Sequence, residues 1–544
     1  MSLLCSNVFG KTESINATLQ RAEKGESQAQ YELAERYLNE PVLNSDLSDA
    51  ANLYKKAADQ GHIKAQYELG KMHFEGTGMP KDLTKAANWF KKPAEQGFAK
   101  AQFYLGLTYK LIDYEAKLKS IVIGKKPTGN NKKIIEEEAL KWCRLASANL
   151  KTLAKSGDAE AQYMLARMYS GGWAGVKDKN SASEWRTNAV ESLKKAAKRG
   201  NIKAQRLLGE IHSYRLDVPE DEAEKVKWYK KAAEQGDAIA QYHLGFHYEF
   251  TKEYANAIEW YTKAANRGHV EAQYELGHIF DSGAWAPAEG AEIKAFHNDI
   301  EAIKWYKKAA KRGHMEAQYQ LGMSYMYDEE IQDYNEAIKW YTEAAQQGHF
   351  EAQSTLGREY YSGKNIPQNY ERAFKWYKKA AEQGEGLSGA FVQQQLADMY
   401  FEGLGVAKDY EKACKWYTIA AKDGAMLAQY CLGRMYHRGE GIMKRYKEAA
   451  VFYTKAAEQG YDLAQYCLAR MYYDGEGVVQ DYVEAYKWAI LAAMGGNDLY
   501  VGFREKLKEE MTKDQIAEGQ KKAREVYDKQ QGKLRELLDK AYGR

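Results

Sequence analysis

The chain has 544 residues, with 79 Lys and Arg against 76 Asp and Glu, so its net charge is only +3. This near balance argues against a nucleic-acid-binding surface, which should be strongly basic. A chain of this length exceeds a single compact core, so we expect several domains or a repeat array. Pro is rare, at 7 residues, which favours helices.

Residues 1–25 form an N-terminal segment that we expect to hold a partial helix of the first repeat. The segment has no basic start and only a short apolar stretch, which does not fit a secretory signal. No run of about 18 apolar residues occurs, so we expect no membrane-spanning helix. The five cysteines lack C-x-x-C spacing and indicate neither a disulfide framework nor a zinc site. We therefore expect a cytoplasmic protein, or one exported without a cleaved signal peptide.

Residues 26–496 are predicted to form a repeat array. A glycine after an Ala-rich, charged stretch recurs along the chain, and six of the twelve intervals between these glycines are 36 residues. The glycines are Gly25, Gly61, Gly97, Gly157, Gly200, Gly236, Gly268, Gly313, Gly348, Gly384, Gly424, Gly460 and Gly496.

Each repeat is predicted to contain two helices. A stretch such as "AQYELGKMH" from Ala65 follows the glycine, and one such as "ACKWYTIAA" from Ala413 precedes the next glycine. Both have the helical period, and the second has a broad apolar face. The closing glycine suits a left-handed C-cap. Residues suited to cap the second helix are Asp82, Asp333, Asn369, Asp409 and Asp481. Since no pair buries its apolar face alone, the pairs must stack into an α-solenoid.

The stretch "AQYCLARMYYDGEGVVQDYVEAYKWAILAAMGG" from Ala464 resembles the Sel-1-like repeat family, a relative of the tetratricopeptide arrays. The resemblance covers roughly residues 14–530. It implies an all-α fold, a right-handed superhelix of about twelve antiparallel helix pairs with a C-terminal capping helix. It also implies an adaptor, since bacterial members often serve in signalling or in contact with host cells.

Two insertions interrupt the period, near residues 110–138 and 283–298. Before Gly157 and Gly200 the A-x-x-W pair lies seven residues further from the glycine than usual, which predicts two second helices that are two turns longer. We expect the rest of the first insertion, with the basic stretch "GKKPTGNNKK", in the turn between two helices, as a tolerated surface insertion or a partner contact. The second insertion contains an unpaired Trp285. Pro93 predicts a kink near the end of its helix.

Residues 497–544 are predicted to be capping helices that cover the apolar face of the last repeat. Within this tail, Thr512 and Gln515 have the spacing of a capping box.

Tyr is unusually abundant, at 42 residues, and many tyrosines lie six residues after a repeat glycine. By analogy with tetratricopeptide repeats, this position faces a concave groove, and the varied positions ten and thirteen after the glycine lie nearby. Tyr and Arg are enriched at binding hot spots. We expect a protein or peptide partner to contact Tyr242, Tyr274, Tyr319, Met323, Arg358, Tyr361, Tyr430, Arg434, His437, Tyr466, Arg470 and Tyr473. The alternative for the tyrosines is packing between repeats.

The sequence shows no recognisable catalytic, cofactor-binding or metal-binding constellation. Gly-rich stretches such as "GLGVAKD" lack the G-K-[ST] ending of a phosphate loop and are predicted to be turns. Four histidines follow a repeat glycine directly, and we expect them to be solvated near a helix start rather than ligands: His62, His269, His314 and His349. Cys431 and Cys467 occupy equivalent positions in consecutive repeats, as two reduced thiols or, alternatively, a redox pair.

The predicted function is therefore a non-catalytic scaffold or adaptor that binds a protein or peptide, without nucleic acid, cofactor or direct membrane insertion. Two alternatives stay open. One is a hydrolase acting on β-lactams, as reported for cysteine-rich relatives that carry a Cys pair in each repeat, which this chain lacks. The other is a soluble subunit of a membrane-linked complex, as in eukaryotic relatives, which would need an anchoring subunit.

Overall fold

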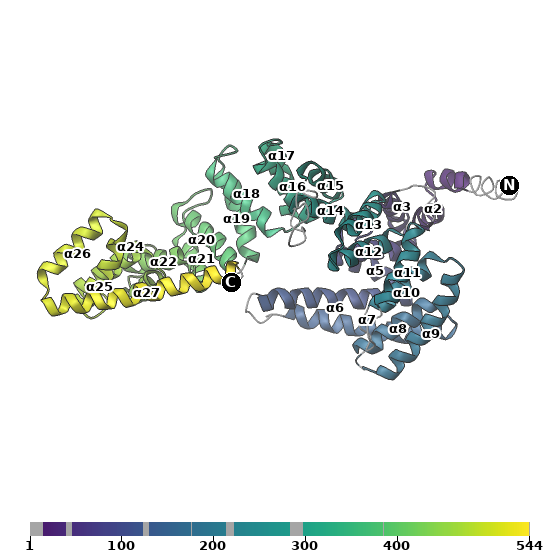
Figure 1. Cartoon of the computed structure of the whole chain (residues 1–544), viewed down its shortest axis with the longest axis horizontal. Helices are drawn as coiled ribbons and strands as arrows, with labels where there is room; N and C mark the ends of the chain where they lie inside the picture. Colours follow the sequence, from purple (N-terminus) through teal and green to yellow (C-terminus); the bar gives the residue numbers. More distant parts are fainter. Residues whose placement is uncertain are drawn as a thin grey trace. The chain divides into compact units, whose positions relative to one another are not determined.

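A computed structural model describes residues 15–39, 46–122, 130–173, 175, 177–213, 222–282, 298–384 and 386–542. The chain folds as two compact units, residues 1–343 and 344–544. Every regular element in the described ranges is helical (Figure 1). Most of the second insertion, with Trp285, lies outside the described residues.

The first unit is built from paired helices that follow a helical segment at residues 15–23. Its helices are α2 (Ser27–Asn39), α3 (Leu47–Asp59), α4 (Ile63–Glu75), α5 (Leu83–Glu95), α6 (Ala99–Val122), α7 (Asn130–Lys155), α8 (Ala159–Gly171), α9 (Lys179–Lys198), α10 (Ile202–Ser213), α11 (Glu222–Glu234), α12 (Ala238–Phe250), α13 (Tyr254–Asn266), α14 (Val270–Ser282), α15 (Asp299–Lys311), α16 (Met315–Tyr327) and α17 (Tyr334–Gln346), within which the unit boundary falls.

The second unit continues the same pairing. Its helices are α18 (Phe350–Ser362), α19 (Tyr370–Gln383), α20 (Gly386–Glu402), α21 (Tyr410–Lys422), α22 (Met426–Arg438), α23 (Tyr446–Glu458), α24 (Asp462–Asp474), α25 (Tyr482–Ala492), the short 3₁₀ helix η3 (Ala493–Gly495), α26 (Asp498–Glu510) and α27 (Lys513–Tyr542). In each unit a helix packs against its partner in the pair and against the next pair, so the predicted all-α solenoid is confirmed.

The predicted helix ends are confirmed with one exception. Twelve of the thirteen repeat glycines adopt the left-handed conformation, which costs glycine little because it has no Cβ. Gly384 instead has φ −78°, and the left-handed residue is Gly386, at the start of the longer helix α20. All five predicted caps of the second helices accept hydrogen bonds from backbone N–H groups of the first turn: Asp82, Asp333, Asn369, Asp409 and Asp481.

The two helices of a pair meet at a tyrosine of the second helix, at the position that Tyr417 occupies in "ACKWYTIAA". Seven of these tyrosines are fully buried: Tyr54, Tyr261, Tyr306, Tyr341, Tyr377, Tyr417 and Tyr453. Each ring packs against the first helix of its pair where the sequence has glycine or, in α2 and α20, alanine. A Cβ placed on Gly277 would lie 2.5 Å from Cδ1 of Tyr306, so the close approach requires the smallest side chain.

The glutamine of the A-Q-Y stretch joins consecutive helix pairs by a hydrogen bond, a role that sequence reasoning missed. In α14, for example, the buried Gln273 donates from Nε2 to the carbonyl of Ala265, eight residues earlier, at 2.9 Å. The same bond recurs from Gln66, Gln102, Gln162, Gln205, Gln241, Gln318, Gln353, Gln429 and Gln465. It satisfies a carbonyl at the end of one second helix that would otherwise lose its partner.

The first insertion differs from its prediction. Helix α9 has 20 residues, seven more than the 13 of an ordinary member such as α11, so the two-turn extension is confirmed. The residues around 110–138, however, do not form a long turn, because α6 continues to Val122 and α7 begins at Asn130. Of the basic stretch, residues 124–129 lie outside the described part, and residues 130–133 are helical. Helix α5 continues past the buried Pro93 to Glu95.

The predicted capping of the last repeat is confirmed. Leu507 of α26 and Ala523 of α27 are buried in the same cluster as Trp488 of α25. The capping box at the start of α27 is present, since Thr512 N–H donates to Oε1 of Gln515 and the Gln515 N–H donates to Oγ1 of Thr512. The apolar face of the last pair is therefore covered by the chain itself.

The tyrosine–glycine contact predicts a position-dependent response to the same substitution. Gly277→Val should lower the free energy of unfolding by about 1–3 kcal/mol, because the added atoms overlap the Tyr306 ring. Gly532→Val in α27 is the matched control, since a Cβ there meets nothing within 4 Å. Urea unfolding measures both. Equal effects at the two positions would contradict this account of the pair interface.

Candidate functional site

The tyrosines six residues after the repeat glycine bridge neighbouring repeats. Tyr242 stacks on His269 and Tyr274 stacks on His314, each with ring centroids 4.6 Å apart. The ring centroid of Tyr319 lies 5.7 Å from that of Tyr341, which belongs to the same helix pair. The alternative of packing between repeats is therefore confirmed for Tyr242 and Tyr274, whereas this contact of Tyr319 lies within its own repeat. All three keep part of their surface accessible.

The histidines after the repeat glycine are not solvated as predicted. His269, His314 and His349 are buried, and the Nδ1 atom of each accepts a hydrogen bond from a backbone N–H three residues later. Burial lowers the pKa of His269 to about 4, so this ring is neutral near pH 7. A neutral imidazole can act as the helix N-cap because its unprotonated nitrogen accepts. Sequence reasoning missed this role because His is an uncommon cap.

In the second unit, equivalent positions of three first helices each carry an arginine followed three residues later by an aromatic ring. The arginines are Arg358 in α18, Arg434 in α22 and Arg470 in α24. The side chains of Arg358 and Arg470 are 52% and 50% exposed. Arg434 is 25% exposed and stacks on the Phe401 ring, 4.7 Å from its centroid. This face therefore offers planar cations from α18, α22 and α24, whereas α20 carries Asp398 at the equivalent position.

The rings at the accompanying positions are partly buried and held in place. Tyr361 lies edge-on to Tyr370, with centroids 5.5 Å apart, and His437 approaches Glu476 at 2.8 Å. Tyr430 of α22 packs against Tyr453 of its own pair. We call the accessible side of the first helices α18, α22 and α24 that carries these arginines and rings the groove face.

Helix α26 covers the end of the groove face. Tyr466 stacks on Tyr500 with centroids 4.7 Å apart, and the hydroxyl of Tyr473 donates to Glu510 at 3.0 Å. Tyr466, Arg470 and Tyr473 nevertheless line a cavity of about 520 Å³ beside α26. The capping helix thus forms one wall of a recess there.

The first unit is closed by contacts between repeats that are far apart in sequence. The N–H of Leu47 donates to the carbonyl of Arg267 at 3.0 Å. The guanidinium of Arg267 donates in turn to the carbonyl of Tyr37 at 3.3 Å. Asp46, which also caps α3, pairs with Arg312. These bonds join the first repeat to the region from α13 to α15.

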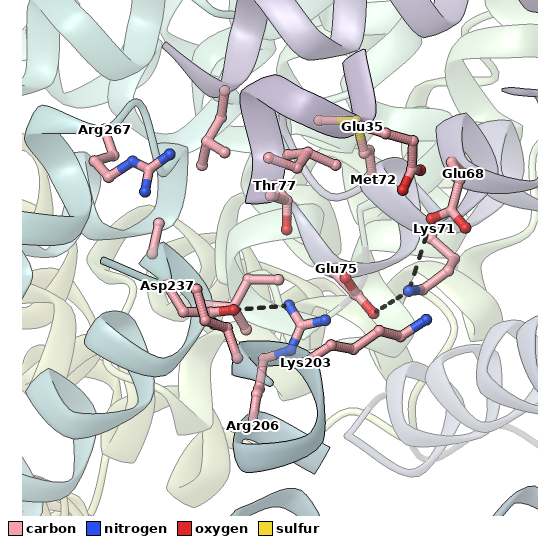
Figure 2. Close-up of a pocket in the computed structure, with 15 residues that line it drawn as sticks. Glu35, Glu68, Lys71, Met72, Glu75, Thr77, Lys203, Arg206, Asp237 and Arg267 are labelled. Carbon is pink, nitrogen blue, oxygen red and sulfur yellow. Dashed lines mark ion pairs between the residues drawn. The ribbon is translucent and has the colours of Figure 1, made fainter. Parts of the chain in front are cut away.

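Beside this closure lies a partly open polar cavity of about 130 Å³ (Figure 2). Helix α4 and the turn after it form one side, and α10 with the start of α12 forms the other. Figure 2 shows Lys71 between Glu68 and Glu75, with Lys203 and Arg206 on the opposite wall. These charged residues were missed by sequence reasoning because they come together only through contacts between distant repeats.

The cavity charges perturb one another strongly. Burial alone would lower the pKa of Lys71, but the Glu75 and Glu68 carboxylates outweigh it and hold the pKa well above its ordinary value. Burial likewise would raise the pKa of Glu160 in α8, but Lys203, Lys71 and Lys100 hold it well below its usual range. Its carboxylate bonds to Lys100 at 2.8 Å and to Lys203 at 3.1 Å. Lys71 and the neighbouring Glu160 are therefore charged at neutral pH, whereas burial raises the pKa of Glu68.

Two predicted groove residues of the first unit line other cavities. Tyr242 lines one of about 590 Å³ together with rings such as Phe246 and Tyr104. Met323 lines one of about 450 Å³ beside Asp299 and Asp328. The predicted set is thus divided between the units, with four residues in the first and eight in the second, and none of the twelve is fully buried.

The described residues give little support for other chemistry. Among them, no three His, Cys, Asp or Glu side chains are grouped so as to hold a metal ion. Cys431 and Cys467 are free thiols, and burial, with Asp398 adding to it, raises the pKa of Cys431 to about 11. No helix in the ranges described is both long and apolar enough to cross a bilayer.

Glu275 in α14 predicts a pH dependence of stability. Burial, together with Glu249 and Glu271, raises its pKa to about 7 from an ordinary 4.5. The folded chain therefore binds a proton more tightly than the unfolded chain, and the stability present below pH 4.5 is lost as the pH rises through 7. Glu275→Gln should recover up to about 3 kcal/mol at about pH 8.

Urea unfolding of the wild type and this variant at about pH 5 and about pH 8 measures the difference. Glu234→Gln, an exposed substitution in α11, is the control and should leave the pH dependence as in the wild type. The assignment fails if Glu275→Gln retains the full pH dependence.

The Sel1 repeat family model matches eleven segments of the chain: residues 27–62, 63–98, 159–201, 202–237, 238–269, 270–314, 316–349, 350–385, 390–424, 427–461 and 462–497. The crystal structure of c5321, a protective antigen present in uropathogenic Escherichia coli strains and displaying an SLR fold, is 28% identical over 97% of each chain, with a TM-score of 0.36. A Sel1 repeat protein from Oxalobacter formigenes is 29% identical over 58% of this chain and 89% of its own, with a TM-score of 0.44. No match was found among curated proteins.

Proposed function

Because this chain belongs to the Sel1 repeat family, whose members generally mediate protein–protein interactions, we propose that it is a non-catalytic scaffold that binds a protein or peptide. The binding surface that we propose is the groove face of the second unit. Tyr242, Tyr274, Tyr319 and Met323 of the first unit would form a secondary contact surface. Bacterial signalling and contact with host cells are the settings that the family resemblance suggests for such a scaffold.

The repeated arginine–aromatic pairs carry this proposal. Arg358 with Tyr361, Arg434 with His437 and Arg470 with Tyr473 occupy matching positions on helices of one solenoid. Packing of the helix pairs does not require arginine there, since α16 has Met323 at the equivalent position. Tyrosine binds partners well because its large rigid ring loses little conformational entropy on contact, and arginine because its planar guanidinium donates several hydrogen bonds in a fixed geometry.

The carboxylates beside the arginines favour an extended partner over a small anion. Arg358 lies 3.4 Å from Glu359, Arg434 lies 3.3 Å from Glu440, and Asp474 is 3.4 Å from Arg470. Each cation thus has a weak local partner, which a peptide carboxylate can replace at the cost of little reorganisation. A row of such exchanges along several repeats fits an extended acidic peptide.

The chemistry of the cysteines argues against the hydrolase alternative. A nucleophilic cysteine needs a lowered pKa, and burial raises the pKa of Cys143 and Cys431 to about 11 each. Both side chains are thus protonated near neutral pH. No contact among the described residues favours the alternative of a membrane-linked complex over a free scaffold.

Peptide selection on the full-length chain tests the proposal. Binders isolated from a displayed random library should be rich in acidic residues. Fluorescence anisotropy should show at least about tenfold weaker binding to the triple variant Arg358→Ala, Arg434→Ala and Arg470→Ala, because each contact contributes about 1 kcal/mol or more.

The matched control is the triple variant Lys378→Ala, Lys415→Ala and Lys447→Ala. It removes the same charge from exposed positions of the second helices α19, α21 and α23. This control should bind as the wild type does, and both variants should keep the helical circular dichroism spectrum. Equal affinity of the two triple variants would reject the groove face.

A further inference from the structure

The polar cavity of the first unit contains two largely buried cations, Lys71 and Arg206, whose hydrogen-bonding groups are not satisfied by the chain. The ammonium of Lys71 lies 3.9 Å from both Glu68 and Glu75. The guanidinium of Arg206 lies 3.7 Å from Glu210 and 3.8 Å from Asp237. These separations exceed the length of an N–H···O hydrogen bond, which is about 3.2 Å at most. A gap therefore remains between each cation and its carboxylates.

Thr77 provides a second and independent observation. Its side chain lines the cavity, is only 4% exposed, and its Oγ1 atom has no hydrogen-bond partner (Figure 2). An unpaired buried hydroxyl costs free energy, and buried polar groups are nearly always paired. The hydroxyl and the two cations thus call for a polar occupant within the same cavity.

The charges lining the cavity define the chemistry of that occupant. Four carboxylates line it, from Glu35, Glu68, Glu75 and Asp237, and four cations, from Lys71, Lys203, Arg206 and Arg267. An added net charge of either sign would face four like charges in a buried setting. A molecule that carries one positive and one negative group meets an opposite charge at each end. The balance therefore favours a zwitterion.

The volume of the cavity limits the size of the molecule that it can hold. A buried cavity of about 150 Å³ is known to hold benzene, which has six non-hydrogen atoms. The present cavity, at about 130 Å³, accommodates a molecule of that size. We propose that it binds a small α-amino acid such as glycine or alanine, with its carboxylate toward Arg206 and Lys203 and its ammonium toward the carboxylates of α4.

Such a ligand would also bear on the closed form of the first unit. It would contact α4 and Thr77 from one repeat and Arg206 of α10 from a distant repeat. Since it binds only when both walls are in place, mass action makes it stabilise the closure that Leu47 and Arg267 form. The small amino acid would thus regulate the rigidity of the first unit.

Calorimetric titration and thermal unfolding of the full chain test the site. Glycine and L-alanine should bind with one-to-one stoichiometry and raise the melting temperature in a saturable way. Propionate and propylamine, which carry one charge each, and L-phenylalanine, which is too large, should do neither. If none of the amino acids binds, water alone fills the cavity and the proposal is wrong. If propionate binds as well as alanine, the site is for anions and the assignment of a zwitterion is wrong.

Two variants locate the binding to these residues. Thr77→Val keeps the shape but removes the hydroxyl, and should weaken alanine binding about tenfold through the loss of one buried hydrogen bond. Lys71→Met removes the central ammonium and should abolish alanine binding. Lys55→Met, on the exposed face of α3, is the control and should bind as the wild type does. Unchanged affinity in folded Thr77→Val protein would place any binding elsewhere and overturn the proposal.

Discussion

The fold depends on the contact between a buried tyrosine of the second helix and a residue without a large side chain in the first. Tyr261 on Gly245 and Tyr306 on Gly277 are typical, with the ring seated against the helix backbone. The close approach also places the phenolic hydroxyl at the far side of the first helix. There it donates to a carboxylate, as Tyr306 does to Asp281 at 3.1 Å and Tyr261 does to Glu249. The same contact thus builds the core and fixes polar groups on the accessible face.

In both units the packing of the helix pairs is regular, whereas the accessible side chains vary from repeat to repeat. In the second unit the first helices present Arg358 and Arg470 with about half of their side chains accessible, and Arg434 with a quarter. In the first unit the bonds of Leu47 and Asp46 to later repeats close the array on itself. Charged side chains are enclosed there as a result, and burial makes their mutual attraction much stronger than at a surface. One repeat sequence therefore supports an accessible face that carries arginines and a polar cavity lined by charged side chains.

The two proposals are separate in their residues and in their ligands. The groove face would bind a peptide by replacing weak local ion pairs, and its contribution would be sensitive to salt. The cavity would bind a small zwitterion through groups that the chain itself leaves unpaired, such as Thr77. If one proposal is wrong, the other is not affected. If both hold, the first unit would respond to a metabolite while the second holds a protein partner.

The family resemblance of the C-terminal tail predicted the closing of the last pair by residues such as Leu507. The repeated motif by itself determined the helix pairs, their stacking and the caps such as Asp82. These features follow from local period and from spacing that recurs, so each copy supports the reading of the others. The burial of His269 and the bond of Gln273 to Ala265 were encoded in the same motif, but their roles depend on where the next pair lies. Helices α6 and α7 extended into the first insertion because pairing with each other gave their added turns a partner.

The cavity was decided by tertiary structure alone. Lys71 lies ten residues after Gly61 and Arg206 six residues after Gly200, so both occupy regular repeat positions, but the repeat spacing does not show that these two distant repeats meet. They meet because the first repeat bonds to the region around Arg267, a contact between distant segments that local sequence does not specify. The short-range period of the sequence determines how a helix pair folds. Contacts between distant repeats determine which charged side chains become buried.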